Sequence, residues 1–165
     1  MNPRMFVPVL LLVSGCVTVY KGPATNHTAS VQASVNGLTT HTMYPNDFLW
    51  LDLFRTGTED RIGAIKMTTD SPQRQIFLDA GASYTLRLTS FEPSFGLNTS
   101  CIAETRLSPQ DGEKYTLSYH TQRNACTLTT KILRVGAGEY EMLATSAGHV
   151  VGTRYTACVR GPGCP

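Results

Sequence analysis

The chain alternates between hydrophobic and polar residues in short runs that are separated by turn-forming residues. In the runs from Tyr84 to Leu88 and from Tyr115 to Tyr119, every second residue is apolar and the residues between them are polar or charged. A period of two places the apolar side chains on one face of a β-strand, which is typical of an antiparallel sheet covering a core on one side. The same pattern predicts ten strands, at residues 30–35, 48–54, 62–69, 75–78, 83–89, 101–107, 114–120, 126–135, 139–143 and 150–158.

The turns between these runs predict the fold class. Gly, Pro, Asn and Asp are concentrated between the runs, as in residues 108–112, and no segment has the apolar spacing of an amphipathic helix. Frequent turns between short strands are typical of a β-sandwich or a barrel. We therefore predict an all-β fold for residues 30–165, an antiparallel β-sandwich of the immunoglobulin-like or transthyretin-like kind.

One predicted strand departs from the alternation. Residues 48–54 read FLWLDLF, so they are apolar on both faces. A strand that is buried on both sides gives this pattern, and so does a strand whose outer face meets a partner. We expect burial on both sides.

Composition and motifs exclude several function classes. The 165 residues suit one domain, and they carry 16% charged residues, a net charge of +2 and no basic cluster, which argues against a nucleic-acid partner. The chain lacks the sequence motifs of serine hydrolases, zinc proteases, P-loop proteins and dinucleotide-binding proteins. Its histidines, at 27, 41, 120 and 149, have no neighbouring nucleophile with an orienting acid. We predict no catalytic residue, no metal site and no cofactor, and hence no enzyme.

The first sixteen residues have the layout of an export signal. Arg4 precedes an apolar run from Met5 to Val13, and the small residues Ser14 and Gly15 follow before Cys16. The apolar run is too short for a spanning helix, which needs about 20 residues. A basic start, a short apolar run and small residues before a cleavage point are typical of a secretory signal.

The segment Val13-Ser14-Gly15-Cys16 resembles the lipobox of bacterial lipoproteins. The resemblance implies cleavage before Cys16, acyl chains on the Cys16 sulfur and on the new amino terminus, and a signal peptide at residues 1–15; the alternative is an ordinary signal with a chance cysteine. Val17 stands where an Asp typically retains such proteins at the inner membrane, which implies the outer membrane, with the periplasmic face expected and surface display as the alternative. Residues 16–29 are expected to form the lipidated amino terminus and a flexible tether.

A longer region resembles small proteobacterial lipoproteins of unknown function. Within residues 81–130 it has a strand entered from Gly81 through a turn to Tyr84, then Cys101, a hairpin at residues 109–115, and Cys126. Residues 81–88 and 112–119 also repeat each other, which indicates a recurring turn that leads into a strand. The resemblance supports the fold more than an activity.

The cysteines predict two disulfides. Besides Cys16 the chain has Cys101, Cys126, Cys158 and Cys164, and an exported protein is expected to pair them. Of three possible connectivities we favour Cys101–Cys126 with Cys158–Cys164. In a flat meander the first and third strands lie about 9.6 Å apart, whereas a disulfide needs Cα atoms within about 7 Å. Either the strand containing Cys101 belongs to a different sheet from the next two, or Cys101 lies beyond the end of its strand.

The candidate binding surface is an apolar loop at residues 90–100, with Phe91, Phe95 and Leu97. Apolar loops can mark an interaction site, but these side chains can also fold back and plug one end of the sandwich, which we favour. The predicted function is a non-enzymatic lipoprotein, a structural accessory of the cell envelope or a binder of another envelope protein. The alternative is an inhibitor or immunity protein that blocks a periplasmic hydrolase or toxin. An inhibitor should present a protruding loop, and an accessory a broad or edge-strand surface.

Overall fold

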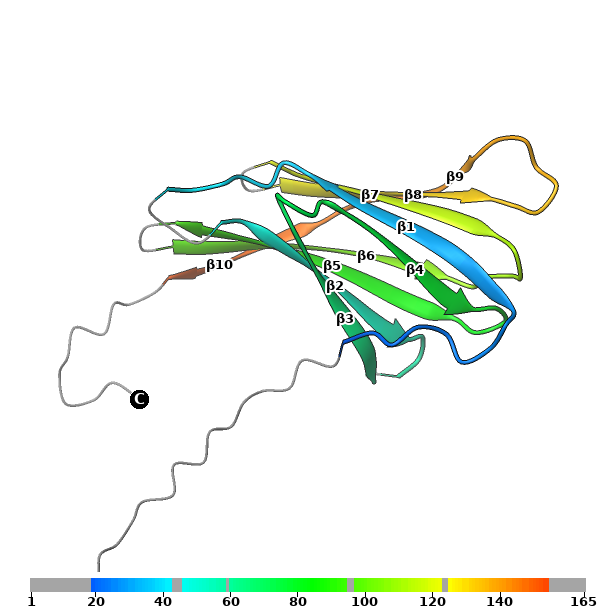
Figure 1. The fold of residues 1–165 in the computed structure, drawn as a ribbon. Coiled ribbons are helices and arrows are strands. Elements are labelled where there is room, and N and C mark those ends of the chain that lie inside the picture. Colours follow the sequence, from blue (N-terminus) through cyan, green and yellow to red (C-terminus); the bar gives the residue numbers. More distant parts are fainter. Residues whose placement is uncertain (1–18, 43–45, 59, 95–96, 123–124, 155–165) are drawn as a thin grey trace, which may run out of the picture.

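The computed structural model describes residues 19–42, 46–58, 60–94, 97–122 and 125–154, which form two stacked five-stranded sheets (Figure 1). Sheet 1 has, in spatial order, β4 (Gln73–Asp79), β1 (Thr28–Asn36), β7 (Lys114–Gln122), β8 (Ala125–Leu133) and β9 (Glu141–Ala147). Sheet 2 has β10 (His149–Arg154), β6 (Leu97–Leu107), β5 (Tyr84–Ser94), β2 (Phe48–Arg55) and β3 (Arg61–Thr68). The predicted β-sandwich is confirmed. Within the described ranges, no helix is long and apolar enough to cross a membrane.

The alternating pattern builds the core. Each inner strand sends every second side chain between the sheets, and the residues between them point outward. The buried apolar side chains include Val31, Val35, Leu49, Leu51, Leu53, Leu78, Leu86, Leu88, Leu117 and Leu128. The ten predicted strands correspond one to one to β1–β10.

The pairing is antiparallel with one exception. β1 pairs antiparallel with β4 on one side and parallel with β7 on the other, from Ser30 opposite Lys114 to Asn36 opposite His120. A parallel pair needs a long connection, and here all of β2 to β6 lies between the two strands in the sequence. The parallel pair of β1 and β7 therefore joins the β4–β1 part of sheet 1 to its β7–β8–β9 part.

The repeated segments perform the same structural task in different sheets. Gly81 and Gly112 have positive φ angles of 79° and 78°, and each lies three residues before an inward-facing tyrosine at the start of a strand: Tyr84 is the first residue of β5, and Tyr115 is the second residue of β7. A positive φ angle favours glycine, which explains why the repeat starts with it. The interpretation as a recurring turn is confirmed.

The favoured Cys101–Cys126 disulfide is present, and it joins the two sheets. Cys101 on β6 and Cys126 on β8 form a disulfide with a Cα–Cα distance of 6.0 Å. Because β6 lies in sheet 2 while β7 and β8 lie in sheet 1, the first of the two expected geometries holds and the bridge joins the sheets. Cys158 and Cys164 lie outside the described residues, so their pairing stays a prediction.

Candidate interaction surfaces

The candidate binding loop at residues 90–100 is a hairpin rather than a loop. β5 extends to Ser94 and β6 starts at Leu97, with pairing from Ser90 opposite Cys101 to Ser94 opposite Leu97. Phe91 does not plug the sandwich, because Ser90 points into the core and Phe91 points outward, where its ring stacks on Phe48 at 4.9 Å between centroids. Phe95 and the side chain of Leu97 lie outside what the structure describes.

The histidines do not come together. His27 Nδ1 lies 3.0 Å from Asp111 Oδ2 at an exposed turn, and His41 Nε2 lies 2.9 Å from Asp47 Oδ1 in another loop. The hydrogen bond to Asp111 raises the pKa of His27. His120 and His149 are exposed on different sheets. In the part of the chain that the structure describes, no three His, Cys, Asp or Glu residues are placed to hold a metal ion.

A cross-sheet polar contact lies next to the disulfide. The hydroxyl of Tyr119, on β7, donates to the Cys101 carbonyl oxygen at 2.8 Å and lies 2.9 Å from Ser90 Oγ. Tyr119 and Ser90 are fully buried, and burial raises the pKa of Tyr119 to about 12, so the phenol stays protonated at physiological pH. This contact supplies the hydrogen bonds that the buried hydroxyls need, which is a structural role.

The chain changes sheets directly over the disulfide. β9 ends at Ala147 in sheet 1 and β10 begins at His149 in sheet 2, so only Gly148 lies between them. A Cβ at Gly148 would lie 2.2 Å from Cys126 Sγ and 2.6 Å from the Ile102 carbonyl oxygen. Only glycine lets the backbone cross this close to the bridge.

A segment that we call the strap (residues 19–27) covers the edges formed by β3 and β4. Val19 forms a parallel bridge with Ala64 on β3, and the Tyr20 hydroxyl donates to the Phe77 carbonyl oxygen on β4. Asp79 accepts hydrogen bonds from the backbone of Ala24 at 3.0 Å and of Thr25 at 2.8 Å, and from the Thr25 hydroxyl at 2.8 Å. These residues of the expected tether are therefore docked on the sandwich.

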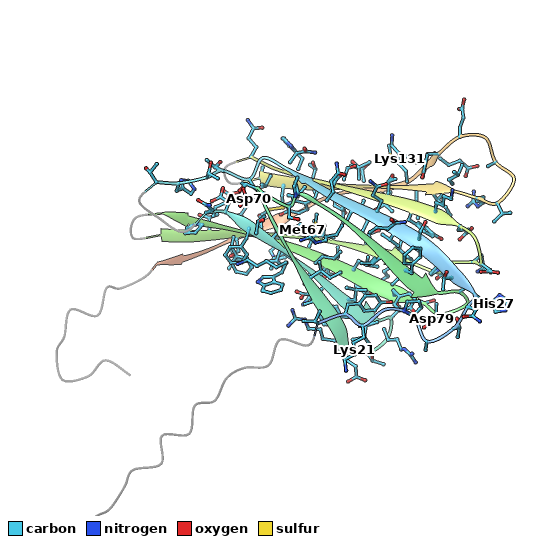
Figure 2. All side chains as sticks on the ribbon, viewed as in Figure 1. Lys21, His27, Met67, Asp70, Asp79 and Lys131 are labelled. Atoms are coloured by element: carbon cyan, nitrogen blue, oxygen red, sulfur yellow. A yellow bond between two sulfur atoms is a disulfide. The ribbon has the colours of Figure 1, made fainter. Side chains whose placement is uncertain are left out.

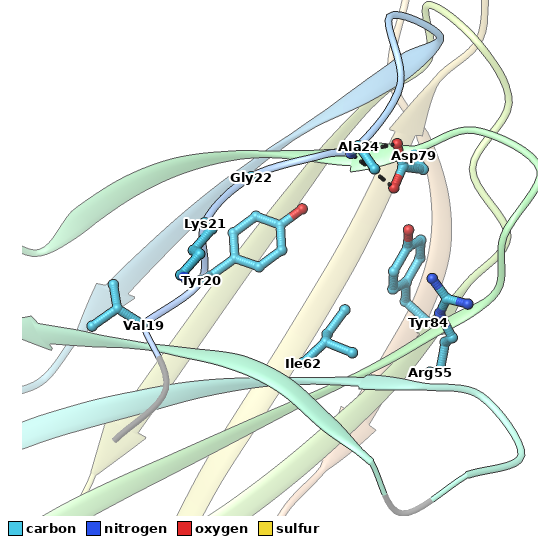
Figure 3. Close-up of a pocket in the computed structure, with 9 residues that line it drawn as sticks. All are labelled: Val19, Tyr20, Lys21, Gly22, Ala24, Arg55, Ile62, Asp79 and Tyr84. Atoms are coloured by element: carbon cyan, nitrogen blue, oxygen red, sulfur yellow. Dashed lines mark hydrogen bonds between the residues drawn. The ribbon is translucent and has the colours of Figure 1, made fainter. Parts of the chain in front are cut away.

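The strap encloses a small cleft with the end of the sandwich (Figure 3). The cleft measures about 340 Å³, and the Tyr20 and Tyr84 rings face it together with Ile62, Asp79 and the basic Arg55. Burial raises the pKa of Tyr20 to about 12 and also raises that of Tyr84, while hydrogen bonds from Thr25 lower the pKa of Asp79. At neutral pH the two phenols are therefore protonated and the Asp79 carboxylate is ionised. Lys21 and Asp79 lie at the same end of the molecule (Figure 2).

The outer face of sheet 2 carries an aromatic surface, which we call the aromatic face. It consists of the outward-pointing Phe48, Trp50 and Phe54 of β2 and Phe91 of β5, all half-buried. The expectation that residues 48–54 would be buried on both sides is therefore wrong: Leu49, Leu51 and Leu53 are in the core, but no other described element packs over the outward side chains.

The terminal strand of sheet 1, β9, is apolar and exposed. No described strand pairs with its free edge, and its residues are exposed at nearly every position, unlike the inner strands. We call the exposed apolar side chains on β9 and the preceding turn the β9 patch: Val135, Tyr140, Met142 and Leu143. Met142 is 60% exposed. The strand contacts sheet 2 where the Ser146 hydroxyl donates to the Glu104 carbonyl oxygen at 3.0 Å.

The sequence gives little warning of these surfaces. Met142 and Leu143 are adjacent apolar residues in a strand whose alternation is broken, and this is the only available signal for β9. The docked strap depends on contacts with residues more than fifty positions away. Comparisons with protein-family models, curated proteins and solved structures yield no match.

Proposed function

We propose that this chain is a non-enzymatic envelope lipoprotein that is anchored through Cys16 in the outer membrane, faces the periplasm, and binds another envelope protein along β9. The observation that carries the proposal is the free, apolar edge of β9. An edge strand presents unpaired backbone donors and acceptors, and an extended segment of a partner can pair with them. The β9 patch would then supply the contacts that select the partner.

The contrast between the two sides of the sandwich supports this proposal. On the side of β3 and β4, the strap covers the edges through Val19, Tyr20 and the Asp79 contacts. The β9 edge has a register shift between Thr130 and Lys131 and a charged residue at Glu141, two features that limit unspecific pairing. Exposed apolar residues on an edge that is otherwise protected in this way fit a specific partner.

The anchor rests on the lipobox and on the cysteine chemistry. The Cys101–Cys126 bridge fits an oxidising compartment such as the periplasm, because cytosolic thiols are kept reduced. Cys16 is separated in sequence from the bridged pair and carries the lipobox resemblance. Two or more acyl chains there would give stable anchoring, at about 0.8 kcal/mol for each buried methylene group.

One observation favours the inhibitor alternative. The β5–β6 hairpin continues to Ser94 opposite Leu97, whereas the neighbouring β2 starts only at Phe48, opposite Phe91. The end of the hairpin therefore extends beyond β2, as an inhibitor that enters the cleft of a hydrolase would require.

In-cell photo-crosslinking from defined positions tests the proposal. A photoreactive residue at Met142 or Leu143 should crosslink to one envelope protein, while the same residue at Gln32, exposed on the polar outer face of β1, should not. If a photoreactive residue at Glu92 crosslinks to a partner and one at Met142 does not, the inhibitor alternative is favoured. Equal labelling from Met142 and Gln32 would contradict the β9 site.

Membrane attachment needs its own test. Mass spectrometry of the mature chain should find acyl chains on Cys16, and Cys16→Ser should abolish membrane retention. An unmodified mature amino terminus at another residue would contradict the anchor.

A further inference from the structure

The two outer faces of the sandwich differ in chemistry. The outward positions of β1 and β7 in sheet 1 carry hydroxyl, amide, imidazole and amino groups: Thr28, Ser30, Gln32, Ser34, Asn36, Lys114, Thr116, Ser118, His120 and Gln122. The corresponding positions of sheet 2 carry the aromatic face, Phe48, Trp50, Phe54 and Phe91. The outer surface of β1 and β7 is thus polar, with the exposed Phe77 on the neighbouring β4 as an apolar exception, whereas the outer surface of β2 and β5 is suited to an amphipathic environment.

Basic side chains accompany the aromatic rings. Lys66 Nζ lies 4.4 Å from the centroid of the Phe48 ring, and Arg87 Cζ lies 5.0 Å from that of Phe54. The acidic groups on this face form ion pairs, Asp52 with Arg61 and Glu104 with Arg87. Among the described residues of the face, no carboxylate pairs with Lys66 or Arg106.

A shallow cleft of about 490 Å³ lies on the same face, lined by Phe54, Arg87, Glu104 and Arg106. Arg87 is paired with Glu104 here, whereas Arg106 has no carboxylate partner among the described residues and presents donors suited to a phosphate group. Aromatic rings with an excess of basic groups match the chemistry of the membrane interface, where aromatic residues are enriched and basic residues attract anionic headgroups.

The position of Val19 places the expected anchor beside this face. Val19 is 67% exposed, and its bridge to Ala64 sets it at the β3 edge of sheet 2. Ala64 is opposite Asp52, which is on the outward side of β2, and bridged residues point to the same side of a sheet. Two residues, Val17 and Thr18, separate Cys16 from Val19, and the three Cα–Cα steps that join them span at most about 11 Å. An acylated Cys16 therefore holds the β3 edge within about 11 Å of the lipid interface.

We propose that the aromatic face is the membrane-facing surface of the protein, and that it rests on the phospholipid headgroups of the leaflet holding the Cys16 lipid. The inference depends on the proposed lipid anchor and adds the orientation of the domain. Sheet 1 then faces away from the bilayer. The rings of Trp50 and Phe48 lie at the headgroup level, and the cleft between Arg87 and Arg106 receives a lipid phosphate.

The single tryptophan of the chain allows a direct test, because Trp50 lies on the aromatic face. The mature, acylated protein is reconstituted in vesicles of phosphatidylethanolamine and phosphatidylglycerol whose acyl chains are brominated close to the carboxyl end. Bromine quenches tryptophan only at short range, so Trp50 emission should fall. Iodide in the aqueous phase should quench Trp50 less in the acylated, vesicle-bound protein than in the Cys16→Ser variant, which is measured in solution without detergent.

A matched control moves the fluorophore to the other face. The variant with Trp50→Phe and Gln32→Trp carries its tryptophan on the outer face of sheet 1, where brominated lipid should leave the emission unchanged. If acylated wild-type protein is bound to vesicles and its Trp50 is no more quenched than the control, the orientation is wrong while the anchor stands. If Cys16 carries no acyl chain, the anchor fails, and the orientation fails with it. If iodide protection of Trp50 requires envelope proteins and lipid alone gives none, the face is a protein interface and the membrane assignment is overturned.

Discussion

Removal of the Cys101–Cys126 disulfide should destabilise the domain strongly. The two cysteines are 25 residues apart, and a closed loop of that length is worth about 3.5 kcal/mol on the chain-entropy model. Both residues are 3% exposed, so replacing them also removes buried packing atoms beneath Gly148. With about 2.1 cal/mol/K of unfolding entropy per residue, the loss corresponds to a fall in Tm of about 13 °C for a domain of this size.

The assay compares Cys101→Ala with Cys126→Ala against the wild type by thermal melting and urea titration. The matched control is Cys158→Ala with Cys164→Ala, whose predicted bridge encloses only residues 159–163 near the end of the sequence, where fraying is expected. Peptide mapping without reduction should first establish the pairing. If mapping links Cys101 or Cys126 to Cys158 or Cys164, the connectivity is wrong. If both double variants have the same Tm, the bridge between sheets adds no more stability than the predicted Cys158–Cys164 bridge, and the core alone stabilises the sandwich.

Three further changes test the surroundings of the bridge and the strap. Gly148→Ala should lower the free energy of unfolding by about 1–3 kcal/mol in urea titration, because a Cβ there overlaps Cys126 Sγ; an unchanged midpoint would contradict the close crossing. Tyr119→Phe should cost about 1–3 kcal/mol, since it leaves the buried Ser90 hydroxyl without its partner, whereas Tyr140→Phe at an exposed position should cost almost nothing. Asp79→Asn should lower the protection factors of the Ala24 and Thr25 amides in hydrogen exchange. Because the folded-state pKa of Asp79 is lowered, its contribution is present above its unfolded pKa and is lost as the pH falls through the lower folded value. Acidification of the wild type through that folded value should therefore lower the same protection factors, each taken relative to the intrinsic exchange rate at that pH, and should leave those of the variant unchanged.

The strands were predictable because their pattern is local. On β5 and β7 the period of two is uninterrupted, and the turns that start these strands carry glycine, so local preference and global fold agree. Once Cys101 was paired with Cys126, the spacing between strands and the distance that a disulfide allows narrowed the geometry to two alternatives, one of which is a bridge between sheets. These arguments need no knowledge of which side chains meet across the core.

The extension of the hairpin was missed because Pro93 and Gly96 are typical of loops. Pro93 is tolerated in β5 because β2 starts at Phe48, opposite Phe91, so β5 has only β6 as a neighbour at Pro93. Proline is accepted at such a local edge, where no partner needs its missing N–H. The register of β2, which lies more than thirty residues earlier in the sequence, therefore decides the conformation of this segment.

The docked strap was missed for a related reason. Gly22 and Pro23 are typical of a flexible segment. The docking comes from long-range contacts: Asp79 accepts the strap amides, and Gly63 leaves room for Tyr20, since a Cβ at Gly63 would lie 2.6 Å from Tyr20 Cα. The docking of the strap therefore depends on Gly63 of β3 and on Asp79 of β4. Neither residue belongs to the strap, so the sequence of the strap alone does not predict that it docks.

The two proposals assign different partners to the two sheets, and the fold makes this division possible. The aromatic face and Val19 belong to the sheet 2 side, and the β9 patch belongs to the far edge of sheet 1. A domain that rests on lipid through sheet 2 would leave β9 accessible to a partner in the periplasm, while the strap would close the opposite edges to strand addition. β9 pairs with β8, and Cys126 on β8 is bridged to Cys101 on β6 of sheet 2. The bridge thus joins the strand next to the proposed partner site to the sheet proposed to face the membrane.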